Sequence, residues 1–244
     1  MIKVPDRNAP TSDLPGPEYK KKPVRSYVIR SGRITAGQIK ALEEHWPHYR
    51  LSLFAGRVPS WQTVFHRVAP VVLEIGFGMG DSLSEMVAND PDKDFIGIEV
   101  HAPGAGRLVS NAAKAGLPNL RVYLADAVDV LTDCIPEQSL ARVQIYFPDP
   151  WHKRKHHKRR LVQTSLAEQI CQKLEPGGIF HLATDWQPYA EYMVEAIGAV
   201  AGFQNMAQQG VYCSRPDYRP ATKFERRGLK MGHGVWDLMY QRTH

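Results

Sequence analysis

Apolar runs recur along the chain at intervals long enough to hold a helix between them, and this alternation constrains the fold most strongly. The five runs are rich in β-branched and aromatic residues: VVLEIG (71–76), DFIGIEV (94–100), LRVYLAD (120–126), VQIYF (143–147) and IFHLATD (179–185). Such runs are typical of strands, and strands separated by helices form βαβ units. The sequence therefore predicts an α/β protein whose mostly parallel sheet carries helices on both faces.

Helix signals fill several of the intervals between these runs. A short helix is predicted over 35–42, and Ser82 with Glu85 fits an S-x-x-E capping box that would begin another helix. Apolar residues recur every fourth position over 162–174, and the Pro-Gly-Gly at 176–178 is expected to end that helix. The basic run at 152–160 (HKRKHHKRR), which precedes this helix, would then sit at a helix N-terminus, where cations oppose the helix dipole.

A chain of 244 residues can bury one sizeable core. We expect residues 1–34 to form a flexible, basic N-terminal segment and residues 35–244 to form a single domain. Apolar runs stay well short of the roughly 20 residues that a membrane span needs, and no signal peptide is apparent. The three cysteines, Cys134, Cys171 and Cys213, are widely spaced, which disfavours disulfides and zinc clusters and favours the cytoplasm.

Positive charge is concentrated in two segments. The net charge is +6, but residues 1–35 and 151–160 together carry +11, which leaves −5 for the rest of the chain. Clustered cations on an otherwise acidic body favour a polyanionic partner such as nucleic acid. The alternative is a solubilising tail combined with a chance cluster.

Acidic residues end or follow the predicted strands, at Glu74, Glu99, Asp126, Asp149 and Asp185. In a parallel sheet with right-handed crossovers, the carboxyl ends of the strands meet at the edge where such sheets bind ligands. These five acids are therefore expected to surround one cleft. Asp126 or Asp185 taken alone would more simply be a helix cap.

The segment EIGFGMGDS places Gly76, Gly78 and Gly80 between a strand and a helix. Asp81 occupies the position where a dinucleotide-binding G-x-G-x-x-G motif would have its last glycine, which disfavours an NAD-dependent enzyme. Five carboxylates suit a cationic cofactor better than a pyrophosphate. S-adenosylmethionine carries a sulfonium and an ammonium, ribose hydroxyls for Glu99, and an adenine amino group for Asp126. The residues therefore indicate a methyltransferase.

The segments EIGFGMG, FIGIEV, FPDPWHKRKHHKRR, LATDW and TKFERRG together give the chain a specific signature. With these segments, the sequence resembles the bacterial tRNA (guanine-N7-)-methyltransferase family from about Arg25 to the C-terminus. The resemblance implies a Rossmann-like class I methyltransferase fold with a seven-stranded sheet over residues 35–244. It also implies methyl transfer from S-adenosylmethionine to N7 of guanine at position 46, in the variable loop of tRNA.

The resemblance assigns roles to individual residues. Asp149 would be catalytic, and the cofactor would be bound by Glu74, Gly76, Gly78, Gly80, Glu99, Asp126 and Asp149. Substrate contacts would come from Lys153, Asp185, Thr222, Lys223, Phe224 and Glu225. RNA contacts would come from Lys155, His156, His157, Lys158, Arg159 and Arg160.

Several of these assignments have simpler alternatives. Thr222 and Glu225 also fit an ordinary T-x-x-E capping box. Trp151 could stack on an extruded base or belong to the core. The histidines of the basic run lack metal-ligand spacing, so no metal site is predicted, and the sequence leaves monomer and homodimer open.

Two other functions remain open from the residues alone. PDPW is similar to the acidic, proline-containing motif of amino-methyltransferases that act on exocyclic nitrogens, although those enzymes usually have two consecutive prolines after the acid. An RNA-binding module that has lost its cofactor would bind tRNA without binding S-adenosylmethionine, but it would leave the acids and the glycine loop without a common purpose.

Overall fold

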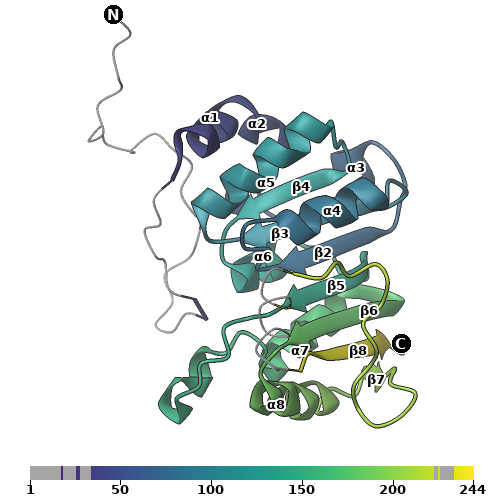
Figure 1. The fold of residues 1–244 in the computed structure, drawn as a ribbon. Helices are drawn as coiled ribbons and strands as arrows, with labels where there is room; N and C mark the ends of the chain where they lie inside the picture. Colours follow the sequence, from purple (N-terminus) through teal and green to yellow (C-terminus); the bar gives the residue numbers. More distant parts are fainter. Residues whose placement is uncertain (1–17, 19–25, 28–33, 223–224, 226–233) are drawn as a thin grey trace, which may run out of the picture.

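One sheet organises the part of the chain that the computed structural model describes, residues 18, 26–27, 34–222, 225 and 234–244. Its strands are β1 (Arg50–Leu51), β2 (Val71–Ile75), β3 (Asp94–Glu99), β4 (Leu120–Leu124), β5 (Leu140–Tyr146), β6 (Leu174–Thr184), β7 (Phe203–Asn205) and β8 (Trp236–Arg242). They lie in the order β1-β4-β3-β2-β5-β6-β8-β7. All neighbours from β1 to β6 are parallel, while β8 is antiparallel to both β6 and β7 (Figure 1).

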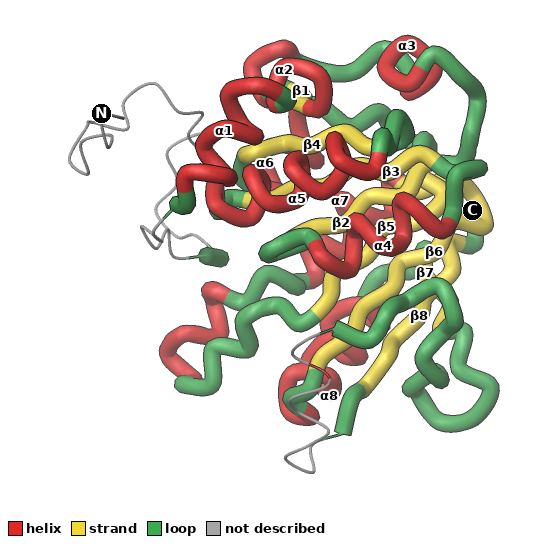
Figure 2. Tube along the Cα trace, turned by 45° about the horizontal axis from the view of Figure 1, so that its top comes forward, coloured by secondary structure: helices red, strands yellow, loops and turns green. Residues whose placement is uncertain are grey.

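Helices cover both faces of this sheet. They are α1 (Ala36–Glu44), α2 (Trp46–Tyr49), α3 (Trp61–Phe65), α4 (Asp81–Asn89), α5 (Ala102–Ala115), α6 (Ala127–Asp133), α7 (Thr164–Lys173) and α8 (Gln187–Gly198). Side chains of α1, α2, α4 and α5 share one buried cluster, and those of α3, α6, α7 and α8 share the other. The view in Figure 2 shows the sheet running between the two layers of helices.

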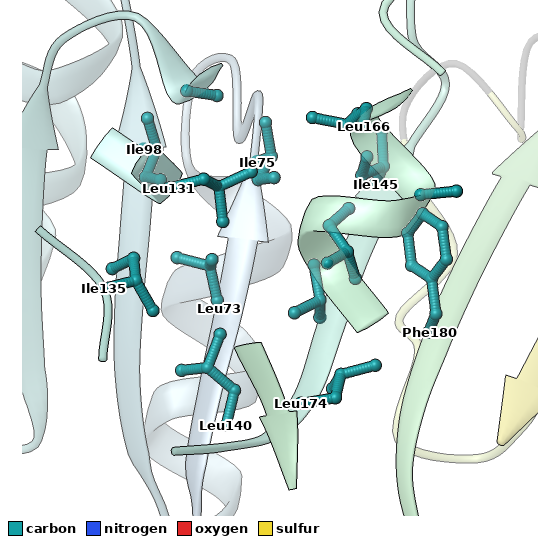
Figure 3. Packing of buried hydrophobic residues seen from close by; sticks show 14 of the residues in the cluster. Leu73, Ile75, Ile98, Leu131, Ile135, Leu140, Ile145, Leu166, Leu174 and Phe180 are labelled. Atoms are coloured by element: carbon teal, nitrogen blue, oxygen red, sulfur yellow. The ribbon is translucent and has the colours of Figure 1, made fainter. Parts of the chain in front are cut away.

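The two clusters lie on opposite faces of the sheet, because successive side chains along each strand point to opposite sides. In β2, Leu73 and Ile75 point into the layer with α6 and α7, whereas Val72 points into the layer with α4 and α5. Figure 3 shows the first layer, where Leu73 and Ile75 lie near Leu131 of α6, and Leu166 of α7 lies beside Ile145 of β5. Both faces of the central strands are thus buried, which explains why the sequences of these strands are almost continuously apolar.

The five predicted strands are confirmed as β2 to β6, and they are mostly parallel as expected. The predicted number of seven strands is too low, because the described residues form eight. The additional strand is β1, whose two residues at the sheet edge are too few to show any alternation in the sequence. The Pro-Gly-Gly at 176–178 lies within β6, since α7 already ends at Lys173.

Helix starts were predicted with mixed success. The helix predicted over 35–42 is confirmed as α1, where Thr35 and Gln38 form a reciprocal capping box. The predicted capping box of Ser82 and Glu85 is wrong, because α4 already begins at Asp81 with Gly80 as its N-cap. Gly80 takes the cap position because its φ of +75° allows the chain to turn sharply from the glycine loop into the helix.

The basic run forms an excursion of its own between β5 and α7. Residues Arg154–Arg159 form a 3-10 helix, η2, which projects away from the sheet in Figures 1 and 2. It precedes α7 by several residues, so its cations do not occupy the first turn of an α-helix as predicted. Across the described ranges, no helix is both long and apolar enough to cross a membrane.

Candidate active site

A cavity of about 820 Å³ opens at the carboxyl ends of β2, β3 and β5. Three of the five predicted acids line it: Glu74 of β2, Glu99 at the end of β3, and Asp149 after β5. The glycine loop at 76–80 forms another part of its wall. The sequence therefore located the cavity correctly, at the edge where open parallel sheets bind ligands.

The other two acids, Asp126 and Asp185, are not among the residues that line this cavity, so the predicted ring of five acids is wrong. Asp126 is buried as the N-cap of α6, and its carboxylate accepts the N–H of Val128 at 2.9 Å. Its neighbours Ala125 and Ala127 line the cavity in its place. Topology fixes which sheet edge an acid reaches, but local side-chain direction decides whether it faces the cavity.

The glycine loop is shaped by backbone conformations that favour glycine. Gly76, Gly78 and Gly80 have φ values of +79°, +59° and +75°. The N–H of Gly78 donates to Oε2 of Glu99 at 2.8 Å, which ties the loop to the end of β3. Sequence analysis missed Gly104 of α5, where a Cβ would lie 1.9 Å from the Gly78 carbonyl oxygen. That helix can pack on the loop only because residue 104 has no side chain.

Glu99 is held rigidly by backbone donors. Its Oε1 accepts the N–H groups of Val100 at 2.7 Å and His101 at 3.1 Å, in addition to the Gly78 bond at Oε2. Burial raises the pKa of Glu99, while these three N–H donors act to lower it. Three of the four acceptor sites of the carboxylate are thus occupied, and Oε2 retains one for a ligand hydroxyl.

Glu74 lies deeper and is 3% exposed. Its Oε2 accepts from Nε2 of Gln144 at 2.7 Å, and Oε1 of Gln144 accepts from Arg142 and from the hydroxyl of Tyr146. Burial raises the pKa of Glu74 to about 7, against the opposing effects of Gln144 and Arg142. The cavity therefore contains a carboxyl group that changes charge near neutral pH.

Asp149 is exposed on a short loop with an unusual backbone. Phe147 and Trp151, which bracket Pro148-Asp149-Pro150, have φ values of +51° and +46°. Residues other than glycine rarely adopt such φ values, and backbone conformations of this kind cluster at functional sites. Trp151 is half-buried, and its Nε1 donates to the carbonyl of Ser26 at 3.3 Å, which supports a structural role for the indole.

The six residues predicted to bind RNA separate into different environments. Lys155 and Lys158 are exposed, as is Lys153, which was predicted to contact the substrate. His156, His157 and Arg159 are half-buried, and Arg160 is only 4% exposed. The burial of Arg160 argues against its predicted contact with phosphates, because its guanidinium packs against protein side chains.

Thr222 and Glu225 exchange hydrogen bonds, as the two residues of a capping box do. Glu225 N–H donates to the Thr222 hydroxyl at 3.1 Å, and Thr222 N–H donates to the Glu225 carboxylate at 3.3 Å. The same carboxylate accepts two bonds from Arg219, at 2.7 and 3.1 Å. Thr222 lines the cavity, but Glu225 is buried, so a direct substrate contact by Glu225 is not supported. The predicted substrate residues Lys223 and Phe224 lie outside the described residues.

Arg219 is a buried residue that sequence analysis missed. Besides Glu225, it binds both carboxylate oxygens of Asp237 in β8, at 2.7 and 2.8 Å. Asp237 also contacts His181 of β6 at 2.8 Å, and burial lowers the pKa of that histidine. These partners lie 6 to 56 residues apart in the chain, so no local pattern could have shown their contact. Among the described residues, no group of three or more potential metal ligands occurs.

Comparisons with known proteins assign the chain to a family. A family model described as "Putative methyltransferase" matches residues 68–238. The chain is 58% identical over 227 residues to the tRNA (guanine-N(7)-)-methyltransferase of Saccharophagus degradans, covering 93% of this chain and 99% of that protein. The enzyme of the same name from Alcanivorax borkumensis is 58% identical over 219 residues, covering 90% and 91%. The chain belongs to the tRNA (guanine-N7-)-methyltransferase family.

Solved structures place this tRNA (guanine-N7-)-methyltransferase family member in the class I methyltransferase fold. The 16S rRNA methyltransferase KamB superimposes with a TM-score of 0.56 at 18% identity, covering 75% of this chain and 93% of that one. The 16S rRNA (adenine(1408)-N(1))-methyltransferase of Catenulisporales acidiphilia gives a TM-score of 0.53 at 15% identity, covering 75% and 92%. At such identities the likeness concerns the fold alone, and it confirms the predicted Rossmann-like architecture.

Proposed function

We propose that this chain transfers a methyl group from S-adenosylmethionine to N7 of guanine in tRNA, at position 46 of the variable loop. The proposal is carried by one juxtaposition: the exposed Asp149 lines the cavity and is followed four residues later by Lys153, the first of three exposed lysines in the basic run. The names of the relatives, at 52–58% identity over most of the chain, support the same activity. The widely spaced cysteines favour the cytoplasm as its location.

The residues of the cavity fit S-adenosylmethionine. A volume of about 820 Å³ falls within the range of about 300–1,000 Å³ that is common for small-molecule sites. Its acids, Glu74, Glu99 and Asp149, complement a ligand with a positively charged sulfonium and ammonium. From the described residues, Oε2 of Glu99 accepts only the Gly78 N–H and so retains acceptor capacity for a ribose hydroxyl. When bound, S-adenosylmethionine supplies an electrophilic methyl group.

The chemistry of guanine N7 determines what Asp149 does. N7 carries a free lone pair and no proton, so its methylation requires no general base. Asp149 can accept from the N1 and N2 hydrogens of guanine, thereby orienting N7, and its negative charge stabilises the cationic purine that forms. We therefore assign Asp149 to positioning and electrostatic stabilisation.

The exposed lysines of the basic run supply a different part of the function. Lys153, Lys155 and Lys158 lie on the excursion that begins at the cavity, where they can neutralise phosphates of the tRNA backbone. Phosphate contacts of this kind position the nucleic acid without selecting its sequence. The short link between Asp149 and these lysines thereby joins guanine positioning to tRNA binding.

Mapping of the methylated nucleoside tests the proposal. Purified protein is incubated with unmodified tRNA and S-adenosylmethionine, and the digested RNA is analysed by mass spectrometry. We expect 7-methylguanosine at position 46. A methyl group on an exocyclic nitrogen would support an amino-methyltransferase instead, and tRNA binding without methylation or cofactor binding would support an RNA-binding module. A tRNA with another base at position 46 is the control and should not be methylated there.

A further inference from the structure

Arg160 belongs to the basic run by sequence, but the structure buries it. The residue is 4% exposed, whereas Lys155 and Lys158 are exposed. Its guanidinium carbon lies 4.8 Å from the ring centroids of both Tyr189 and Tyr192, two residues of α8. Burial lowers the pKa of Arg160, but an arginine remains protonated in proteins. Arg160 is thus a buried cation held against two aromatic rings.

The hydrogen bonds of Arg160 are directed at the loop that carries Asp149. Its Nε donates to the carbonyl oxygen of Pro150 at 3.0 Å, and Nη2 contacts Nε2 of His157 at 3.1 Å. Pro150 directly follows Asp149 in the chain. Among the described residues, Arg160 makes no ion pair with an acid. Its side-chain hydrogen bonds therefore go to a backbone carbonyl and to the imidazole ring of His157.

The loop requires such a restraint because its backbone is strained. Phe147 and Trp151 both have positive φ values, a backbone conformation that is unfavourable for residues other than glycine. Strained conformations persist only when surrounding contacts hold them in place. The bond between Arg160 and Pro150 is one of these contacts, and it acts one residue away from Asp149.

A second set of contacts fastens Arg160 to α8. The hydroxyl of Tyr192 donates to Oε1 of Gln163 at 2.6 Å, and Nε2 of Gln163 donates to the carbonyls of His157 and Arg160 at 3.1 Å each. Helix α8 begins at Gln187, two residues after Asp185. The helix therefore fixes the loop of Asp149 relative to the end of β6, where Asp185 lies.

We propose that Arg160 is a positioning residue for the methyl transfer, and that it holds Asp149 in place through Pro150 instead of contacting tRNA. This inference rests on the proposed function of the site. It divides the basic run into exposed lysines that bind phosphates and one buried arginine that shapes the active-site loop.

Charge-preserving substitution separates the two roles. A phosphate contact tolerates Arg160→Lys, because a lysine also neutralises a phosphate. A positioning role does not, because an ammonium lacks the planar fork that lies against two rings while bonding a carbonyl. We therefore expect Arg160→Lys to lower the single-turnover rate at saturating tRNA and S-adenosylmethionine by about 10²-fold, the effect of misplacing a reacting group by about 1 Å. The salt dependence of tRNA binding should be unchanged.

Lys158→Ala is the contrasting variant. It should reduce the log-log salt slope of tRNA binding by roughly one unit, whereas Arg160→Lys should leave that slope unchanged. Thermal unfolding and S-adenosylmethionine titration show whether each variant folds and binds its cofactor. If Arg160→Lys does not fold, Tyr192→Phe provides the test. It keeps the ring but removes the hydroxyl that orients Gln163, and it should lower the saturated rate without altering the salt slope.

The outcomes distinguish this inference from the proposed function. If wild-type protein does not methylate guanine N7, the proposed function fails. If wild type is active and a folded Arg160→Lys keeps the wild-type rate, the positioning role is refuted. A full rate in Arg160→Lys together with a reduced salt slope in Arg160→Ala would identify Arg160 as a phosphate contact. If Arg160→Lys does not fold, a wild-type rate in Tyr192→Phe refutes the inference.

Discussion

Replacement of Glu74 by glutamine should make the stability of the protein less dependent on pH. Glu74 is 3% exposed, and burial raises its pKa from 4.5 to about 7. Between these two values the folded protein keeps the proton while the unfolded chain loses it. The contribution of Glu74 to folding stability is therefore fully present below pH 4.5 and is lost as the pH rises from there through about 7.

The size of this effect follows from the two pKa values. At about 1.4 kcal/mol per pKa unit, a pKa raised from 4.5 to about 7 costs about 3 kcal/mol of stability once the pH is well above 7. Most of this loss, roughly 2–3 kcal/mol, falls between pH 5 and pH 8. Glutamine has nearly the same shape and cannot ionise, so Glu74→Gln avoids the loss. Its amide oxygen can still accept from Gln144.

Urea unfolding of wild type and Glu74→Gln at pH 5, 6, 7 and 8 measures the effect directly. The difference in unfolding free energy should shift in favour of Glu74→Gln by roughly 2–3 kcal/mol across this range. Taking the difference removes the contributions of titrating groups that the two proteins share. Glu168→Gln makes the same chemical change at an exposed position of α7 and provides the baseline. A constant difference between wild type and Glu74→Gln from pH 5 to pH 8 would refute the reasoning.

Four further predictions concern the site. Glu99→Ala should weaken S-adenosylmethionine binding by more than about tenfold in calorimetry, and an unchanged affinity would exclude its contact with the ribose. Alanine at Lys155, Lys158 and Arg159 should lower the salt slope of tRNA binding by up to about three units, and an unaltered slope would mean that the run is only a solvated surface. Asp149→Asn should lose most of kcat/KM while still binding cofactor, because an amide brings donors toward the donor edge of guanine. Single-turnover rates that rise tenfold per pH unit in wild type, but not in Asp149→Asn, would instead show that Asp149 is a base. Arg219→Ala should destabilise the fold by about 3–5 kcal/mol in urea unfolding, because Glu225 and Asp237 would lose their buried partner; a wild-type midpoint would contradict this.

The sheet could be predicted largely from the chain because its information is local. Each central strand, such as β2, is a short apolar run that any compact packing must bury, and the intervals between runs have room for crossover helices. Parallel pairing then brings the strand ends to one edge, which correctly placed Glu74, Glu99 and Asp149 on one cavity. The two-residue strand β1 escaped prediction because so short a segment carries no periodicity.

Side-chain direction and long-range partners were decided by tertiary structure alone. Asp126 follows β4 as other acids follow their strands, and packing decided that it takes the alternative role of a helix cap, which the sequence also offered, instead of facing the cavity. Arg219 and Asp237 meet only because β8 inserts beside β6. In sequence Arg160 cannot be distinguished from Lys158, because both are cations in one run. The sequence determined which residue types reach the active edge, whereas packing determined whether each one faces the cavity, solvent or another buried residue, because that depends on contacts between segments far apart in the chain.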